Sequence, residues 1–365
     1  PMLVVFRFLQ GFVAGPLVPL SQSLMIMTFP KDKRNMAIAI WAFIVIIGPV
    51  IGPILGGWLT YNYDWRWIFY INIPVGIFCT IVIYSIFKTR ESVVKKVKGD
   101  LVGFCLLLVA MTSLQIILDF GQIYDWWRSN SIWILTIAFS ISFVGFLIWE
   151  YYDENPVINF SFFKNWNFSL GTILISLSYM LFFGSIVITP LWLQDYMGYT
   201  AQNSGLAVST MGLGSIIFIA LVPFAMKKVD AKYLVAITFF IFGITSYWFA
   251  QFTTAVSIDY IAVSRFAFGL GIVFYMAPIL SRALIDFTGN QLETASGVFH
   301  FFRVLMGGVG TAVFTVMWER RRTFHHSNIV SNLTSYNPTF AEAKERLAQV
   351  GATGKSALEL IDQSA

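Results

Sequence analysis

The sequence predicts an all-α polytopic membrane protein, a helix bundle with about ten transmembrane spans. First, 57% of the 365 residues are hydrophobic, only 12% are charged, and the mean hydropathy is +0.71. This composition supplies too little polar surface to cover a water-soluble globule. Second, apolar stretches of about nineteen or more residues recur along the chain. Third, basic residues gather in every second connection between these stretches, as they do in multi-pass membrane proteins.

The apolar stretches predict the spans in chain order. We place them at 1–28, 36–60, 67–88, 101–118, 131–150, 168–194, 204–226, 232–250, 258–281 and 294–318. The chain opens with "PMLVVFRFLQG", already inside a helix, and we therefore expect a fragment of a longer protein. Between the third and fourth spans, "KTRESVVKKVKGD" is typical of a solvated cytoplasmic linker.

The distribution of lysine and arginine predicts the orientation of the bundle. One set of alternate loops holds Lys31, Lys33, Arg34, Lys88, Arg90, Lys95, Lys96, Lys98, Lys164, Lys227, Lys228, Lys232 and Arg282. The opposite short loops hold only Arg66 and Arg128. Because positive charge is retained in the cytoplasm, the first span is expected to run inward and the segment after Trp318 to lie outside. The net charge of +5 is thus a topology signal, and no nucleic-acid partner is expected.

The sequence offers no motif of an enzyme or a metal protein. Cys79 and Cys105 fall within apolar spans, where a thiol behaves as a small hydrophobe, and they lack metal-ligand spacing. We find no nucleophile triad, phosphate loop or pair of carboxylates. We therefore expect a protein that is not an enzyme, with no metal and no cofactor.

Two short matches suggest an internal repeat. "RFLQG" from Arg7 to Gly11 resembles "RFAFG" from Arg265 to Gly269, and the same offset places Gly52 on Gly310. Short matches in apolar sequence also arise by chance. We interpret these as two pseudo-symmetric halves, an arrangement common in transporters.

The second span contains a stripe of glycine and proline within "GPVIGPILGGW". Its members are Gly48, Pro49, Gly52, Pro53, Gly56 and Gly57. Glycine at every fourth position makes a bare helix face, and tight helix packing alone would explain it. The prolines also remove amide donors and bend a helix. We therefore expect a smooth, deformable seam between the two halves.

These motifs carry a family resemblance. "VVFRFLQGFVAGPLVPLSQSL", "GPVIGPILGGW" and "DWRWIFYINIPVG" resemble the fourth to sixth helices of the fourteen-span drug:proton antiporters of the major facilitator superfamily, most of all the EmrB type. "SLQIILD", "ISLSYMLFFGSIV", "LQDYMGYTA" and "MWERRRTFHH" extend the resemblance along nearly the whole chain. It implies that the first three helices and the last one are missing, together with the acidic residue of the first helix.

The resemblance also implies a domain organisation. Residues 1–88 would be the remainder of the N-terminal helix bundle, and 89–167 two additional linker helices with cytoplasmic loops. Residues 168–318 would form the C-terminal bundle, and 319–365 a periplasmic loop. In this family the glycine and proline stripe is the antiporter motif.

Basic residues within apolar spans are costly and therefore candidates for function. The resemblance implies that Arg7, in its "RxxxG" motif, takes part in proton coupling. Small residues follow on the same helix face as Arg7 and suit a bundle interior. Snorkelling to the membrane surface is the alternative. Arg265, Glu293, His300 and Arg303 are expected to form a structural polar cluster, in which the last three close the cytoplasmic end.

A substrate pathway is expected on the central helices. Its candidates are Ser21 and Gln22 as polar groups and Tyr179, Met180, Phe182, Phe183, Phe274, Tyr275 and Met276 as an adaptable apolar surface. Because the chain has 36 phenylalanines, many aromatic side chains must instead face lipid or neighbouring helices.

Together these features predict a proton-driven efflux antiporter that exports hydrophobic toxic compounds across a bacterial inner membrane. The resemblance implies lipophilic drug-like substrates, protons and membrane lipids as partners, with a periplasmic EmrA-like adaptor and a TolC-like outer-membrane channel. Two alternatives remain open. One is an importer or symporter of a small organic solute, and the other is a nontransporting membrane sensor or scaffold.

Overall fold

The computed structural model describes residues 2–30, 33–88, 99–154, 156–219 and 221–332, and within these ranges it contains helices and no strand. The helices of the first part are α1 (Met2–Ala14), α2 (Leu17–Thr28), α3 (Arg34–Asn62), α4 (Trp67–Tyr70), α5 (Asn72–Phe87), α6 (Leu101–Phe120) and α7 (Asn130–Tyr152). They are followed by α8 (Trp166–Asp195), α9 (Ala201–Ile219), α10 (Val222–Lys228), α11 (Ala231–Ala250), α12 (Ile258–Val273), α13 (Met276–Ala283) and α14 (Asn290–Asn332). Short 3₁₀ turns occupy Trp126–Arg128 and Phe160–Lys164.

The helices agree with the expected membrane spans. Within the described residues, 8 helices or continuous helix pairs are long and apolar enough to cross a bilayer, and the bent pair α9–α10 raises the number to 9. The remaining expected span, 36–60, lies in α3, a helix of 29 residues. The prediction of an all-α polytopic bundle is therefore confirmed.

Several expected spans are interrupted, and in two of them a proline gives the break a backbone cause. Between α1 and α2, Pro16 has no amide to donate to Phe12, and the chain turns at Gly15–Pro16. Between α12 and α13, Pro278 cannot donate to the carbonyl of Phe274, where α12 ends. The run of hydrophobic residues showed the span in both cases but not the interruption.

The helix α14 is longer than expected. It has 43 residues and continues past Trp318 to Asn332, where we expected a loop to have begun. Outside the bundle its basic side chains meet aromatic rings, with Arg320 5.3 Å from the ring of Trp126 and Arg322 5.8 Å from that of Tyr196. The rest of the predicted periplasmic loop, 333–365, and most of the linker, 89–98, lie outside the described residues.

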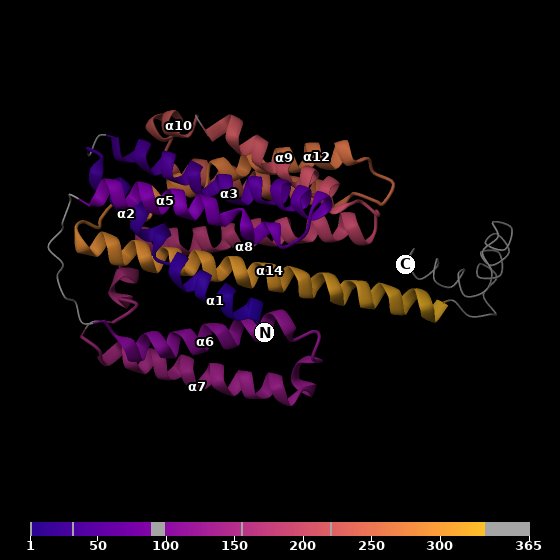
Figure 1. The fold of residues 1–365 in the computed structure, drawn as a ribbon, viewed down its shortest axis with the longest axis horizontal. Coiled ribbons are helices and arrows are strands. Elements are labelled where there is room, and N and C mark those ends of the chain that lie inside the picture. The colour runs from indigo at the N-terminus through magenta and orange to yellow at the C-terminus, as the bar shows by residue number, and fades with distance from the viewer. Residues whose placement is uncertain (1, 31–32, 89–98, 155, 220, 333–365) are drawn as a thin grey trace.

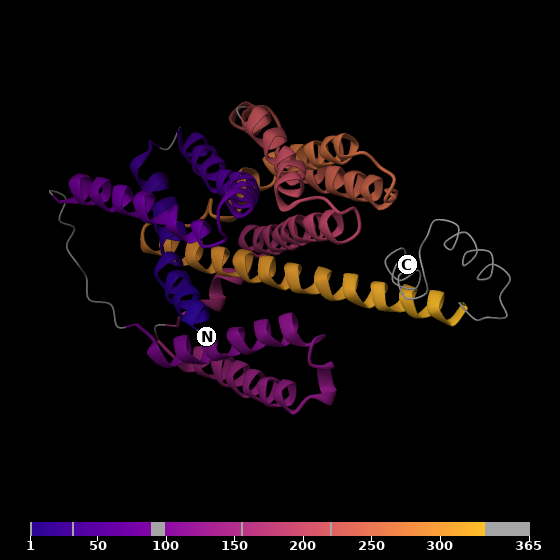
Figure 2. The same ribbon diagram turned by 45° about the vertical axis from the view of Figure 1, so that its right-hand side comes forward.

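The helices α8, α9, α11, α12, α13 and α14 pack together as one bundle, and α2 and α3 lie against its side (Figure 1). The contacts that join the two sets include those of α2 with α14, α3 with α13, and α3 with α9. The hairpin of α6 and α7 stands apart and touches α14 through α6 (Figure 2). The main hydrophobic core lies where α3, α8, α13 and α14 meet.

Candidate functional site

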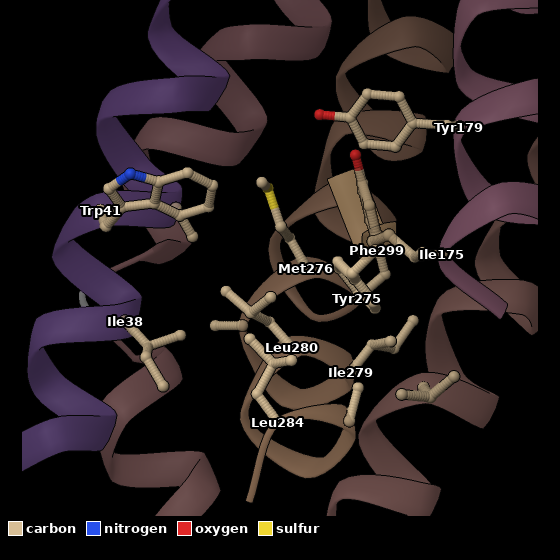
Figure 3. Packing of buried hydrophobic residues seen from close by; sticks show 14 of the residues in the cluster. Ile38, Trp41, Ile175, Tyr179, Tyr275, Met276, Ile279, Leu280, Leu284 and Phe299 are labelled. Carbon is tan, nitrogen blue, oxygen red and sulfur yellow. The ribbon is translucent and has the colours of Figure 1, made fainter. Parts of the chain in front are cut away.

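The candidate site lies where α2 and α3 meet α13 and α14, toward one end of the bundle. We call this the inner end, because the residues that begin α3, α8, α11 and α14 are located there and carry the basic loops predicted to face the cytoplasm. Here Trp41 of α3 faces Met276, Tyr275 and Tyr179 across the core (Figure 3). All four side chains are buried.

Gln22 of α2 joins the two sets of helices at this place. Its side chain is fully buried, and its amide oxygen accepts hydrogen bonds from the hydroxyl of Ser296, at 2.9 Å, and from Nε2 of His300. Both donors belong to α14. Next to it, Ser21 accepts a hydrogen bond of 3.0 Å from the indole nitrogen of Trp41. The two sets of helices are thus joined here by a polar contact as well as by apolar packing.

Arg303 lies one turn further along α14, surrounded by aromatic rings. Its guanidinium carbon is 4.7 Å from the ring centre of Tyr179 and 5.9 Å from that of Trp41. His300 also lies beside Trp41, with 5.2 Å between the centres of the two rings. The side chain of Arg303 is only 3% exposed, and within the described residues its Nε and Nη1 have no hydrogen-bond partner.

The structure corrects the predicted polar cluster, whose four members do not lie together. Arg265 of α12 donates instead to Ser185 at 2.7 Å and Thr189 at 3.3 Å on α8, and its guanidinium lies 4.0 Å from the ring of Phe249. Ser185 and Thr189 are six or more residues beyond Tyr179, the residue of α8 that lies beside Arg303. The surroundings of Arg265 and Arg303 are therefore separated by roughly 9 Å or more along the axis of α8.

Glu293 also stands outside the cluster, because its side chain is exposed whereas His300 and Arg303 are buried. The spacing of seven residues between Glu293 and His300 gives the same helix face. It also separates them by about 10 Å along the axis, which leaves the carboxylate at the membrane surface.

The predicted substrate residues divide by burial. Tyr179, Phe182, Tyr275 and Met276 belong to the buried core, and Gln22 takes part in the contact just described. The side chains of Met180, Phe183 and Phe274 are half-buried, and Ser21 is exposed. Reasoning from sequence did not single out Trp41, which shares its span with Phe43 and Trp58 and carries no signal of its own.

A cavity with a volume of about 880 Å³ lies at the inner end. Ile26 and Ile38 line it from one side and Leu174 and Phe239 from the other, with basic side chains at its wall. The basic residues are Arg34, Lys232 and Arg282. None of the predicted substrate residues lines this cavity.

The structure brings only part of the predicted glycine and proline stripe into a helix contact: Pro53 and Gly57 approach α9, whereas Gly48, Gly52 and Gly56 do not. A Cβ atom at Gly48, Gly52 or Gly56 would meet no described atom within 4 Å, so this face is not packed against a helix here. A Cβ at Gly57 would lie 2.8 Å from the carbonyl oxygen of Ala201 in α9. A Cβ at Gly205 of α9 would in turn collide with the carbonyl of Pro53.

The close approach of α3 and α9 therefore lies on the face of Pro53 and Gly57. On an α-helix each residue is rotated by about 100° from the one before it. The face of Gly57 is therefore turned by about 100° from the predicted face of Gly56. The helix also runs through Pro49 and Pro53 without ending.

Arg7 does not face a bundle interior in the described structure. It is exposed on α1, which has no buried residue, and it donates to the side-chain oxygen of Gln10 at 3.1 Å. Its guanidinium carbon lies 4.5 Å from the ring centre of Phe69 in α4. A Cβ atom at Gly11, one turn from Arg7, would meet no described atom within 4 Å, so this face of α1 is not closely packed there.

Outside the spans, Asp286 ties two inner loops together. Its carboxylate accepts hydrogen bonds from the side-chain amides of Asn165, at 2.8 Å, and Asn167, at 3.2 Å. These hydrogen bonds favour the charged form and hold the pKa of Asp286 below its ordinary value. The start of α8 is thereby joined to the connection between α13 and α14.

A bundle of apolar helices in two sets, joined across a buried aromatic and polar contact, defines a multi-pass membrane protein. Comparison with known proteins identifies the group: a model of the Major Facilitator Superfamily matches residues 1–311, and the chain belongs to this family.

Its relatives include the fatty acid resistance protein FarB of Neisseria gonorrhoeae, 38% identical over 99% of this chain and 71% of the relative. The multidrug export protein EmrB of Escherichia coli K12 is 37% identical over 99% of this chain and 71% of its own length. The probable multidrug resistance protein EmrY of the same strain is 37% identical over 94% and 67%. The chain is therefore similar to EmrB-type exporters over nearly its whole length.

Proposed function

We propose that this protein is a proton-driven efflux antiporter that exports hydrophobic toxic compounds across a bacterial inner membrane. The observation that carries the proposal is the contact at the inner end, where Trp41, Tyr179, Tyr275 and Met276 form an apolar surface between two sets of helices. Aromatic faces and methionine adapt to ligands of varied shape, as a multidrug site requires. The names of the EmrB, EmrY and FarB relatives support the same role.

The contact at the inner end suggests how access alternates. The hydrogen bonds from Ser296 and His300 to Gln22 hold α2 against α14. Separation of α2 and α3 from α13 and α14 would break these hydrogen bonds and expose the aromatic surface to the cytoplasm. Only a change of this kind allows one site to be loaded from one side and emptied to the other.

The energy would come from the proton gradient. Inward movement of one proton supplies about 2.3 kcal/mol per 100 mV and about 1.4 kcal/mol per pH unit. We expect no cofactor beyond this gradient. Arg7 is proposed, from the family resemblance, to tune the proton-carrying carboxylate.

The proposal includes a tripartite pump with an EmrA-like periplasmic adaptor and a TolC-like outer-membrane channel. The extension of α14 beyond Trp318 provides an exposed outer surface rich in basic residues. Co-purification of the adaptor with the wild-type protein, and its loss when Arg320, Arg321 and Arg322 are replaced by alanine, would support this part. Undiminished co-purification would show that the adaptor binds another surface of the protein.

Transport by inverted membrane vesicles tests the main proposal. Vesicles that contain the protein should accumulate a fluorescent lipophilic dye when an interior-acid pH gradient is imposed, and nigericin should release it. Dye that accumulates only when the gradient is reversed would indicate symport. Vesicles that behave like empty controls under both gradients would indicate a sensor or scaffold.

A further inference from the structure

The cavity of about 880 Å³ at the inner end lies between the two sets of helices. Arg34 and Ile38 of α3 line it from one set, and Phe239 of α11 and Arg282 of α13 line it from the other. Its volume is within the range of about 300–1,000 Å³ that is typical of small-molecule sites. Trp41 is not among its lining residues, so this cavity is distinct from the contact proposed to bind drugs.

The lining of the cavity changes from basic to apolar with depth. Arg34 is the first residue of α3, and Ile38 lies one turn deeper. Lys232 is the second residue of α11, and Phe239 follows it about 10 Å deeper along the axis. On α13, which ends at this surface, Arg282 is again nearest the end, and apolar lining residues precede it. An occupant that fits this lining is amphipathic, with a negative charge at the membrane surface and an apolar part below it.

The positive charge of the lining is only partly balanced. Among the lining residues the acidic one is Asp230, whose carboxylate lies 3.8 Å from the amine of Lys232. Within the part of the chain that the structure describes, neither Arg34 nor Arg282 forms a direct ion pair. The Nε of Arg34 is moreover buried there without a hydrogen-bond partner. The nearby carboxylate of Asp286 already accepts hydrogen bonds from two asparagines.

We propose that this cavity binds an anionic phospholipid from the leaflet at the inner end of the bundle. Arg34, Lys232 and Arg282 would hold the phosphate of the headgroup, and an acyl chain would lie along the apolar wall between Ile38 and Phe239. A phosphate accepts several charge-assisted hydrogen bonds at once, and a guanidinium matches its geometry.

The apolar wall favours a lipid over a free phosphate as the occupant. A soluble anion would use the basic residues alone and leave Leu174, Ile38 and Phe239 against water. Trp166, which also lines the cavity, has an exposed indole of the kind that lies at a membrane surface. Basic pockets between spans on the cytoplasmic side are suited to anionic headgroups, because the lipid supplies the charge at the depth where the cations lie.

The position of the cavity connects the lipid with the contact between the two sets of helices. Arg34 belongs to α3, whereas Lys232 and Arg282 belong to the C-terminal bundle. These three cations repel one another across the cavity when no anion lies between them. A bound phosphate would reverse that effect and favour the arrangement in which α3 packs against α13.

Binding of two lipids to the delipidated full-length protein in detergent tests the proposal. Dioleoylphosphatidylglycerol and dioleoylphosphatidylcholine have the same acyl chains and differ in headgroup charge. The wild-type protein should bind phosphatidylglycerol at least tenfold more tightly than phosphatidylcholine. Lys232→Gln combined with Arg282→Gln, at two exposed positions, should reduce this preference to less than threefold.

Lys227→Gln combined with Lys228→Gln is the matched control. It removes the same charge from exposed positions at the same end, and neither residue lines the cavity. This control should keep the lipid preference within about twofold of wild type. An equal loss in both double variants would mean that phosphatidylglycerol follows the general positive charge of this surface, and it would overturn the site.

Two measurements on the wild-type protein remain decisive if a variant fails to fold. Phosphatidylglycerol should raise the thermal midpoint more than phosphatidylcholine does, and equal shifts would reject the proposal. Inorganic phosphate that displaces phosphatidylglycerol at equal concentration would assign the basic residues to a soluble anion and reject the lipid. These measurements need neither a drug nor a proton gradient, so their outcome is independent of the proposed export function.

Discussion

At the scale of the residue, the three basic side chains that lie within spans differ in burial. Arg265 and Arg303 are 2% and 3% exposed and contact side chains of other helices, whereas Arg7 is exposed and meets Phe69 and Gln10. All three were candidates because a charge within an apolar span is costly. Hydropathy identifies such a charge but does not show what surrounds it.

Arg7→Ala distinguishes a role in proton coupling from snorkelling. If Arg7 tunes a carboxylate, this substitution should abolish proton-driven efflux and leave the affinity for a lipophilic dye within about twofold, since binding depends on apolar contacts elsewhere. Arg7→Lys should retain partial efflux. Substrate affinity in detergent and flux in liposomes are to be measured at matched protein levels. Normal flux in both variants would remove Arg7 from the mechanism.

Asp286 predicts a dependence of stability on pH. The pKa of its carboxyl group is lowered in the folded protein, so its contribution is present above the ordinary aspartate range, near 4, and is lost as the pH falls through the folded value. Asp286→Asn should therefore lower the thermal midpoint at pH 7, and the difference from wild type should shrink below about pH 4. Asp230→Asn, at an exposed aspartate near the same end, is the control. A difference that stays constant with pH would contradict the assignment.

At the scale of the element, α3 shows why a helical motif does not specify its own partner. Glycine at every fourth position predicts a bare face, but the close contact with α9 falls on Pro53 and Gly57. A helix offers several faces with small residues, and the one that packs is selected by the neighbouring helices. The breaks beside Gly15–Pro16 and before Pro278 are local effects of proline and needed no tertiary information.

Gly57→Leu and Gly52→Leu form a matched pair on α3. The side chain at position 57 would collide with the backbone of α9 and should cost about 1–3 kcal/mol or more, whereas the side chain at position 52 has space in this state. We expect Gly57→Leu to lower the thermal midpoint by several degrees and to impair efflux, and Gly52→Leu to keep its midpoint. Loss of efflux by Gly52→Leu without loss of stability would show that its face packs in another state of the cycle. Equal midpoints for the two variants would contradict the observed seam.

At the scale of the whole molecule, the alternation of charged loops predicts sidedness. Single cysteines in place of Lys228, at the inner end, and Phe324, on the extension of α14, should react with a membrane-impermeant maleimide from opposite sides of the membrane. Both side chains are exposed, so accessibility will not limit the reaction. Labelling of both from one side would invalidate the orientation.

By itself the sequence determined that this protein is a polytopic helical membrane protein and where its spans lie, and it predicts which ends face the cytoplasm. These properties depend on the hydropathy and charge of contiguous residues, which each segment carries wherever it packs. Only the tertiary structure decided that Gln22 meets His300, that Arg265 and Arg303 lie in separate surroundings, and that Gly57 rather than Gly52 approaches α9. Such pairings depend on the rotation and depth of helices far apart in the chain, and in an apolar solvent many rotations satisfy the same hydropathy.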